Sequence, residues 1–142
     1  MSAKTAPQHT PDELTYHGTS HEIAVFTSAS ASRPGERNFT YRDVITGESY
    51  CECKGAECGR RCWHLDWLET AWIMVAVAPF VAALDAAALC ATGTAAGARV
   101  KAGTFTVTDL AVYHQCRAEW RRRKAAPAPV VALPAVAVAL AA

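Results

Sequence analysis

The sequence predicts a small α+β protein, in which an antiparallel hairpin and a helix form a ββα unit and additional helices follow toward the C-terminus. Apolar residues alternate between positions 37 and 53, which is the period of a strand with one buried face. From Leu65 to Val75 they recur every three or four positions, which is the period of a helix. A second helical pattern covers residues 108–125, so an additional helix is expected near the C-terminal end.

Length, charge and the N-terminal sequence limit the class of protein. The chain has 142 residues, enough for one domain. Its net charge of +1 gives no overall field that would select a polyanionic partner, although basic residues gather toward the C-terminal end. The polar N-terminus lacks the apolar core of a secretory signal. We therefore expect a cytoplasmic protein in a reducing compartment, where cysteines more often bind metals or catalyse reactions than form disulfides.

The predicted strands lie in the first third of the chain. Residues 20–27 contain a short alternating pattern that favours a strand. In the hairpin that follows, Phe39, Tyr41 and Ile45 share one face, and Thr46, Gly47 and Glu48 supply the turn before the return strand.

Composition divides the chain into five segments. They are a flexible leader at 1–18, the hairpin with its following helices at 19–92, a small-residue linker at 93–107, a basic helix at 108–125 and a low-complexity Ala/Pro/Val tail at 126–142. Thr108 is the expected N-cap of the basic helix, and Asp109 lies favourably at its positive end.

One apolar stretch, residues 73–91, is long enough to cross a membrane. Asp85 near its middle costs about 2.5–3.5 kcal/mol on an insertion scale, which cancels most of the gain from its apolar residues. We therefore expect a buried helical hairpin broken near Pro79, and we do not expect a membrane to be a partner.

Four cysteines and one histidine crowd into residues 51–64. Cys51 and Cys53 are two residues apart at the end of a strand, so their side chains lie on one face. Cys62 and His64 lie at the expected start of the following helix, whose positive end favours thiolates. Three thiolates and one imidazole form a closed tetrahedral site for Zn²⁺. Cys58 lies between the two pairs; the alternatives are that it replaces Cys53 or His64 as a ligand or that it is a spare thiol, and we expect the spare role.

A redox site, a disulfide cluster and a set of ordinary buried thiols fit the cysteine segment less well. A redox site favours Cys-x-x-Cys, which is absent, and a disulfide cluster does not suit a reducing compartment. Four cysteines within so short a segment are an improbable set of ordinary buried thiols. A catalytic zinc would need an open coordination position, and no other catalytic motif is present, so we expect no enzyme activity.

The pattern Cys-x-Cys, eight residues, Cys-x-His, with Tyr50 before it and an amphipathic helix after it, resembles the SWIM-type zinc finger. The resemblance covers about residues 20–78. It implies a ββα zinc-binding fold with Cys51, Cys53, Cys62 and His64 as ligands. It also implies binding of DNA or of protein, because both are ascribed to the family's module.

Two functions follow as hypotheses. The first is a nucleic-acid-binding module, most plausibly for DNA, that uses the basic residues Arg60, Arg61, Arg117, Arg121, Arg122, Arg123 and Lys124. The second is an adaptor that docks a larger protein through the finger and the alanine-rich helices.

The remaining cysteines and histidines are isolated in the sequence. We expect Cys90 and Cys116 to be small buried side chains. The remaining histidines have no cluster around them, and we expect them on the surface: they are His9, His17, His21 and His114.

Overall fold

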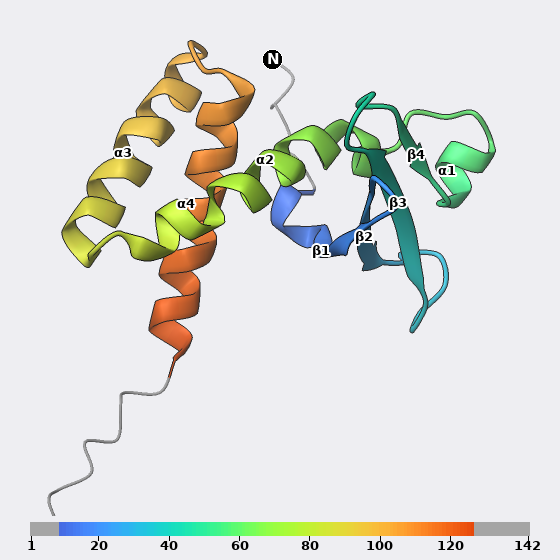
Figure 1. The fold of residues 1–142 in the computed structure, drawn as a ribbon, viewed down its shortest axis with the longest axis horizontal. Helices are drawn as coiled ribbons and strands as arrows, with labels where there is room; N and C mark the ends of the chain where they lie inside the picture. The colour runs from blue at the N-terminus through green and yellow to red at the C-terminus, as the bar shows by residue number, and fades with distance from the viewer. Residues whose placement is uncertain (1–8, 127–142) are drawn as a thin grey trace, which may run out of the picture.

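A computed structural model describes residues 9–126, so residues 1–8 of the predicted leader and residues 127–142 of the predicted tail lie outside the described part. The molecule is an α+β protein, as predicted. A four-stranded antiparallel sheet packs on the first half of a long helix, and a pair of helices packs on its second half (Figure 1). The long helix α2 therefore connects two layers of different kind.

The sheet is a simple meander. It contains β1 (Thr15–Ser20), β2 (Ile23–Ala29), β3 (Arg37–Asp43) and β4 (Ser49–Cys51), in the order β1-β2-β3-β4 with every pair antiparallel. The predicted short strand and hairpin are confirmed as β2, β3 and β4, but the prediction for Ile45 is wrong: β3 ends at Asp43, so Ile45 lies in the turn and does not share the face of Phe39 and Tyr41.

The prediction of a flexible leader is wrong for residues 10–18. A short 3₁₀ helix η1 (Pro11–Glu13) begins this segment, and Thr15 and Tyr16 of β1 then pair with Thr27 and Phe26. Polar residues and two prolines suggested a coil, but β1 is an edge strand, and an edge strand needs few apolar residues.

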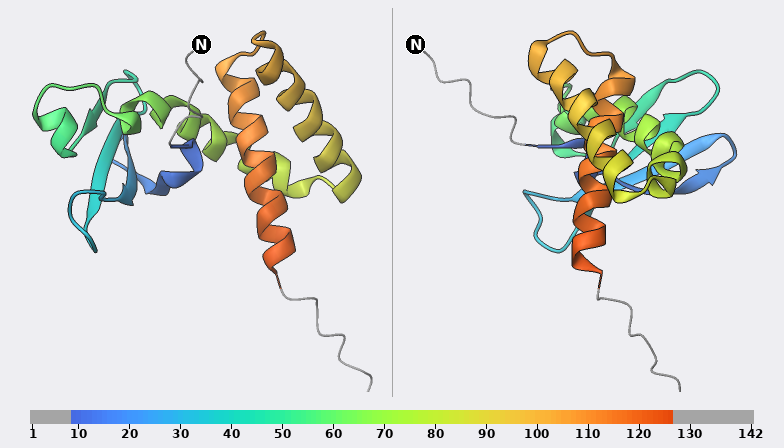
Figure 2. Two further views of the ribbon diagram at one scale, coloured as in Figure 1. Left: turned by 180° about the vertical axis from the view of Figure 1, so that it is seen from behind. Right: turned by 90° about the vertical axis from the view of Figure 1, so that its left-hand side faces the viewer.

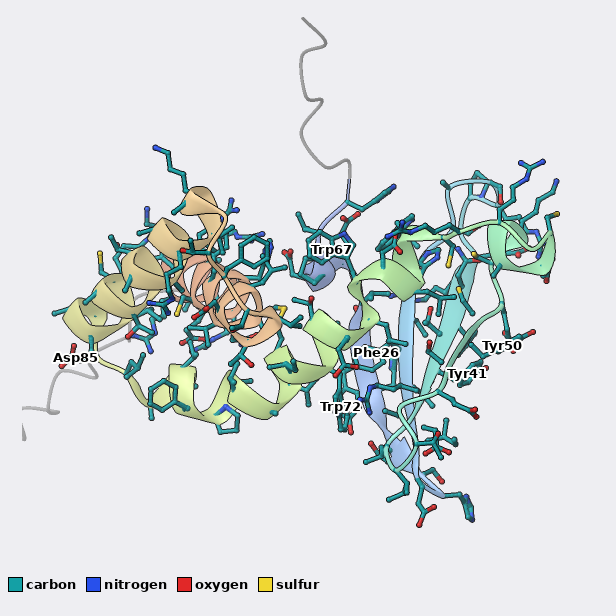
Figure 3. All side chains as sticks on the ribbon, turned by 90° about the horizontal axis from the view of Figure 1, so that it is seen from above. Phe26, Tyr41, Tyr50, Trp67, Trp72 and Asp85 are labelled. Carbon is teal, nitrogen blue, oxygen red and sulfur yellow. The ribbon has the colours of Figure 1, made fainter. Side chains whose placement is uncertain are left out.

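The core lies between one face of the sheet and α2 (Trp63–Ala83). Ala24 and Phe26 of β2 pack against Leu68 and Ala71 of α2 and against Leu14. Figure 3 shows Phe26 between the sheet and α2. Burying side chains of the size of Phe26 and Leu68 stabilises the fold by about 1.5–3 kcal/mol each.

Helix α2 does not break at Pro79, contrary to the sequence-based expectation. It continues to Ala83, and Asp85 then caps α3 (Ala86–Ala102) by accepting a hydrogen bond from the N–H of Ala88 at 2.8 Å. A proline inside a helix costs about 3 kcal/mol. The turn beyond Pro79 is held by packing, because Val81 is fully buried against neighbouring helices.

Among the described helices, α2 alone is long and apolar enough to cross a membrane, judged by length and composition. Its most apolar window has a mean hydropathy of 1.4, and 28% of that window is buried in the protein. The helix packs on the sheet with one half and on α4 with the other.

The predicted linker is largely helical. Residues 93–102 belong to α3, and only residues 103–106 connect it to α4 (Val107–Ala125). The glycines that suggested flexibility serve close packing: a Cβ on Gly97 would lie 3.0 Å from Tyr113 Cε2, and one on Gly93 would lie 3.1 Å from Cys116 Cβ. Figure 2 shows the resulting antiparallel pair, α3 against α4.

The basic helix begins slightly earlier than predicted. Thr106, rather than Thr108, is the N-cap of α4, and it forms a reciprocal capping box with Asp109. The favourable position of Asp109 in the first turn is confirmed.

The C-terminal end of α4 is bound to the end of α2 by an ion network. Glu119 is 5% exposed, and it accepts hydrogen bonds from Arg122 and Arg123 at 2.7 Å. These hydrogen bonds, the one from Arg122 first, lower the pKa of Glu119 to about 2. Arg123 also donates to the carbonyl oxygens of Ala82 at 3.1 Å and Leu84 at 2.7 Å, which the end of α2 leaves without helical partners.

We predict that Arg123→Ala lowers the free energy of unfolding by about 1–3 kcal/mol, because it leaves two carbonyls and part of Glu119 without donors. Thermal unfolding followed by far-UV circular dichroism measures the change. Lys124→Ala is the matched control, since Lys124 forms no ion pair within the described chain. Equal melting temperatures for the two variants would contradict the capping role.

Candidate metal centre

Three structural elements place the four candidate ligands. Cys51 is the last residue of β4, and Cys53 is the N-cap of the short helix α1 (Lys54–Glu57). Cys62 is the N-cap of α2, and His64 lies in the first turn of that helix. The sequence did not indicate α1, whose single turn reverses the chain so that Arg60 N–H donates to Gly55 O at 2.8 Å. The reversal brings the second pair of ligands back to the first.

The ligand atoms converge. One sulfur from each of Cys51, Cys53 and Cys62 and one ring nitrogen of His64 all lie within 4.8 Å of one another, and all four residues are buried. In a tetrahedral zinc site with typical bond lengths, ligand atoms are about 3.5–3.8 Å apart. The cluster could therefore hold a metal ion after a small contraction.

The imidazole of His64 supports metal binding independently. Its ring is buried, and neither Nδ1 nor Nε2 has a hydrogen-bond partner in the described structure. An unpartnered buried polar atom is costly, and a metal ion would satisfy one of these two nitrogens. Trp63 lies beside the ring, with the centroids 4.0 Å apart, and His9 stacks on Trp63 with centroids 4.1 Å apart.

Burial favours the neutral forms of Cys51, Cys62 and His64. It raises the pKa of Cys51 to about 12, against the opposing hydrogen bonds from Thr40 and from the N–H of Cys53, and it also raises the pKa of Cys62. Burial lowers the pKa of His64, so its imidazole is neutral and ready to coordinate.

Cys53 is the exception among the thiols. Burial alone would raise its pKa, but hydrogen bonds lower it, the first of them from the N–H of Ala56, which lies 3.4 Å from the sulfur. The hydrogen bond from the N–H of Ala56 therefore favours the thiolate form of Cys53, and any thiol that binds a metal loses its proton as it does so.

None of the six cysteines forms a disulfide. Cys58 ends α1 with an exposed side chain and is not part of the cluster, in agreement with its predicted spare role. Cys116 is buried as predicted, whereas the prediction for Cys90 is wrong: it is exposed and lines a groove between α3 and α4. The surface prediction for His114 is also wrong: it is 6% exposed and packs edge-on against Trp67.

The predicted basic surface is not brought together by the fold. Arg60 and Arg61 lie in the loop before α2, and the remaining basic candidates lie on α4, at a different end of the molecule (Figure 1, Figure 2). Most of them have internal partners: Arg61 pairs with Asp66, Arg121 with Asp12, Arg122 and Arg123 with Glu119, Arg117 with the Tyr113 hydroxyl, and Lys124 with the Trp120 ring. Arg60 forms no ion pair within the described residues.

Sequence reasoning missed a polar groove of about 570 Å³ beside the cluster. Arg37, Lys54 and Arg61 line it together with three of the four candidate ligands. Ser28, which also lines the groove, has a buried hydroxyl with no hydrogen-bond partner in the described structure. These residues come from β2, β3 and the loop around α1, so only the register of the sheet could have revealed their proximity.

We predict that the purified chain binds one metal ion and that Cys51→Ala, Cys53→Ala, Cys62→Ala and His64→Ala each abolish binding, because each removes one of four ligands. Elemental analysis measures the metal, and far-UV circular dichroism reports the fold. Cys58→Ala is the control and should keep both. Loss of metal in Cys58→Ala with retention in His64→Ala would show that the ligand set is wrong.

Comparison with known proteins identifies no relatives. No protein-family model matches the chain, no curated protein is significantly similar to it, and no solved structure matches its fold. The candidate metal site therefore rests on the geometry described above, and the resemblance to SWIM-type fingers remains a prediction from the sequence pattern.

Proposed function

We propose that the protein is a non-enzymatic SWIM-type zinc finger, in which one Zn²⁺ is held by Cys51, Cys53, Cys62 and His64. The observation that carries this proposal is a buried set of three sulfurs and one otherwise unpartnered imidazole. Sulfur and imidazole ligands suit Zn²⁺, and four protein ligands leave no position for an activated water. The ion would have a structural role.

The role of such an ion follows from the small size of the finger. The buried face of the sheet contributes few large apolar residues, chiefly Phe26. A metal that joins the end of β4 to the start of α2 would stabilise this junction where apolar packing is thin. Lys54 and Arg60 are exposed on the same loop and would offset the negative charge of three thiolates on one Zn²⁺.

We further propose that the finger binds nucleic acid in the cytoplasm. Support comes from Arg60 and Lys54, which are exposed and have no ion-pair partner in the described chain, and from the groove that Lys54 shares with Arg37 and Arg61. The basic end of α4 contributes less, because its arginines are engaged within the fold. Lysine and arginine contacts to phosphates would supply most of the affinity.

We predict that binding of a fluorescent oligonucleotide weakens as salt rises, and that Arg60→Ala reduces the slope of log affinity against log salt by about 1, because one phosphate contact is lost. Fluorescence anisotropy measures both quantities. Lys101→Ala on α3 removes the same charge far from the finger and should leave the slope unchanged. Salt-independent binding would contradict the proposal.

A second candidate function is docking of a protein partner on the helical part of the molecule. One observation favours it: a groove of about 740 Å³ between α3 and α4, which Leu89, Gly93, Tyr113 and the exposed Trp120 help to line. Exposed tryptophan in an apolar groove is typical of binding hot spots.

We predict that a protein retained by the immobilised chain is lost with Trp120→Ala and kept with Phe105→Ala. The two aromatic rings have similar exposure, 41% and 43%, but Phe105 lies outside the groove. Affinity capture followed by mass spectrometry provides the comparison. Equal recovery with both variants would exclude the groove as the docking site.

A further inference from the structure

The face of the sheet that points away from α2 carries a row of three aromatic rings. Phe39 and Tyr41 lie on β3, and Tyr50 lies on β4. The rings of Phe39 and Tyr41 are stacked with centroids 6.3 Å apart, and those of Tyr41 and Tyr50 with centroids 6.2 Å apart. We call these three residues the aromatic row.

Strand register explains why the rings line up. Tyr41 pairs directly with Tyr50 across the β3–β4 ladder, and Phe39 precedes Tyr41 by two residues, so all three side chains leave the same face. Phe26 lies on the opposite face, which α2 covers, whereas Tyr41 and Tyr50 point away from α2 (Figure 3). The fold therefore does not use the row as its main core.

Exposure distinguishes the row from ordinary surface residues. Phe39 is 40% exposed and Tyr50 is 59% exposed, and they share one ladder with Tyr41. Single exposed apolar residues are normal on a protein surface, but contiguous exposed aromatic side chains usually mark a binding site. Partly exposed aromatic rings suit a partner with flat groups of its own.

Positive charge lies at one end of the row. Arg37 precedes Phe39 by two residues on the same face of β3, where its Nε donates to Thr27 Oγ1 at 2.8 Å. Arg37 also lines the polar groove that contains Lys54. One carboxylate lies near the row: Glu52 accepts a hydrogen bond from the Tyr41 hydroxyl at 3.1 Å.

We infer that this face binds single-stranded nucleic acid, with unpaired bases stacked on Phe39, Tyr41 and Tyr50 and a phosphate held by Arg37 and Lys54. Stacked rings beside basic groups are the combination that binds single strands without sequence preference. In a duplex the faces of the bases are already stacked on one another, so they cannot stack on these rings. The inference rests on the proposed nucleic-acid-binding function, but it depends on the aromatic row, which that proposal did not use.

The test measures anisotropy of a fluorescent oligothymidine and of a duplex of the same length, with the full chain and added Zn²⁺. We expect the single strand to bind about tenfold more tightly than the duplex. Tyr50→Ala and Phe39→Ala should each weaken single-strand binding at least about fivefold, the loss expected for one base–ring stack. Tyr50→Phe keeps the ring and should bind like the parent protein, and Glu52→Gln should bind more tightly because it removes a negative charge.

The control is Ile45→Ala, which removes an apolar side chain that is 72% exposed but lies outside the row. It should not change affinity, and all variants should keep the parent metal content and circular dichroism spectrum. Equal binding of single strand and duplex, or an unchanged affinity in Tyr50→Ala, would overturn the inference. If binding then still depends on Arg60, the proposed function survives; if no oligonucleotide binds at all, both fail.

Discussion

The junction where β4 ends and α2 begins is the constraint on which the rest of this structure depends. Three buried thiols and a buried imidazole meet there, and none of the described residues satisfies the ring nitrogens of the imidazole. Without a cation, such a site contains unpartnered polar groups in the place where a fold of this size most needs cohesion. With one, the same groups fix the direction in which α2 leaves the sheet, and so determine where everything after residue 64 is located.

The direction of helix α2 also determines where the second half of the molecule lies relative to the sheet. Its first half covers Phe26 and Ala24 of the sheet, and its second half packs on α4. Arg123 of α4 then donates to the carbonyl oxygens of Ala82 and Leu84, so the far end of the helix is bound to α4. The sheet and the helical pair are thus parts of one arrangement built around a shared helix.

Part of this arrangement could be predicted from the sequence, because the spacing of residues along a strand or helix and the position of turns determine which nearby side chains meet. Alternation placed β2, β3 and β4, and the spacing of the cysteines and His64 anticipated their convergence. Contacts between distant segments were not accessible in this way. The glycines of α3 suggested a linker, because the sequence does not show that α4 packs closely against them. Pro79 suggested a break in the helix, because the sequence does not show the packing that buries Val81 beyond it. The aromatic row and the polar groove likewise required the strand register, which joins residues that no local pattern connects.

One distant contact, between Asp12 and Arg121, also bears on the order in which the protein assembles on the ribosome. The two residues are 109 positions apart, so this pair closes only after α4 has been synthesised, whereas the core between the sheet and α2 uses residues up to Val75. The sheet and its core can therefore form before α4 is available, and the contact between the N-terminal segment and α4 closes only after that helix has been made.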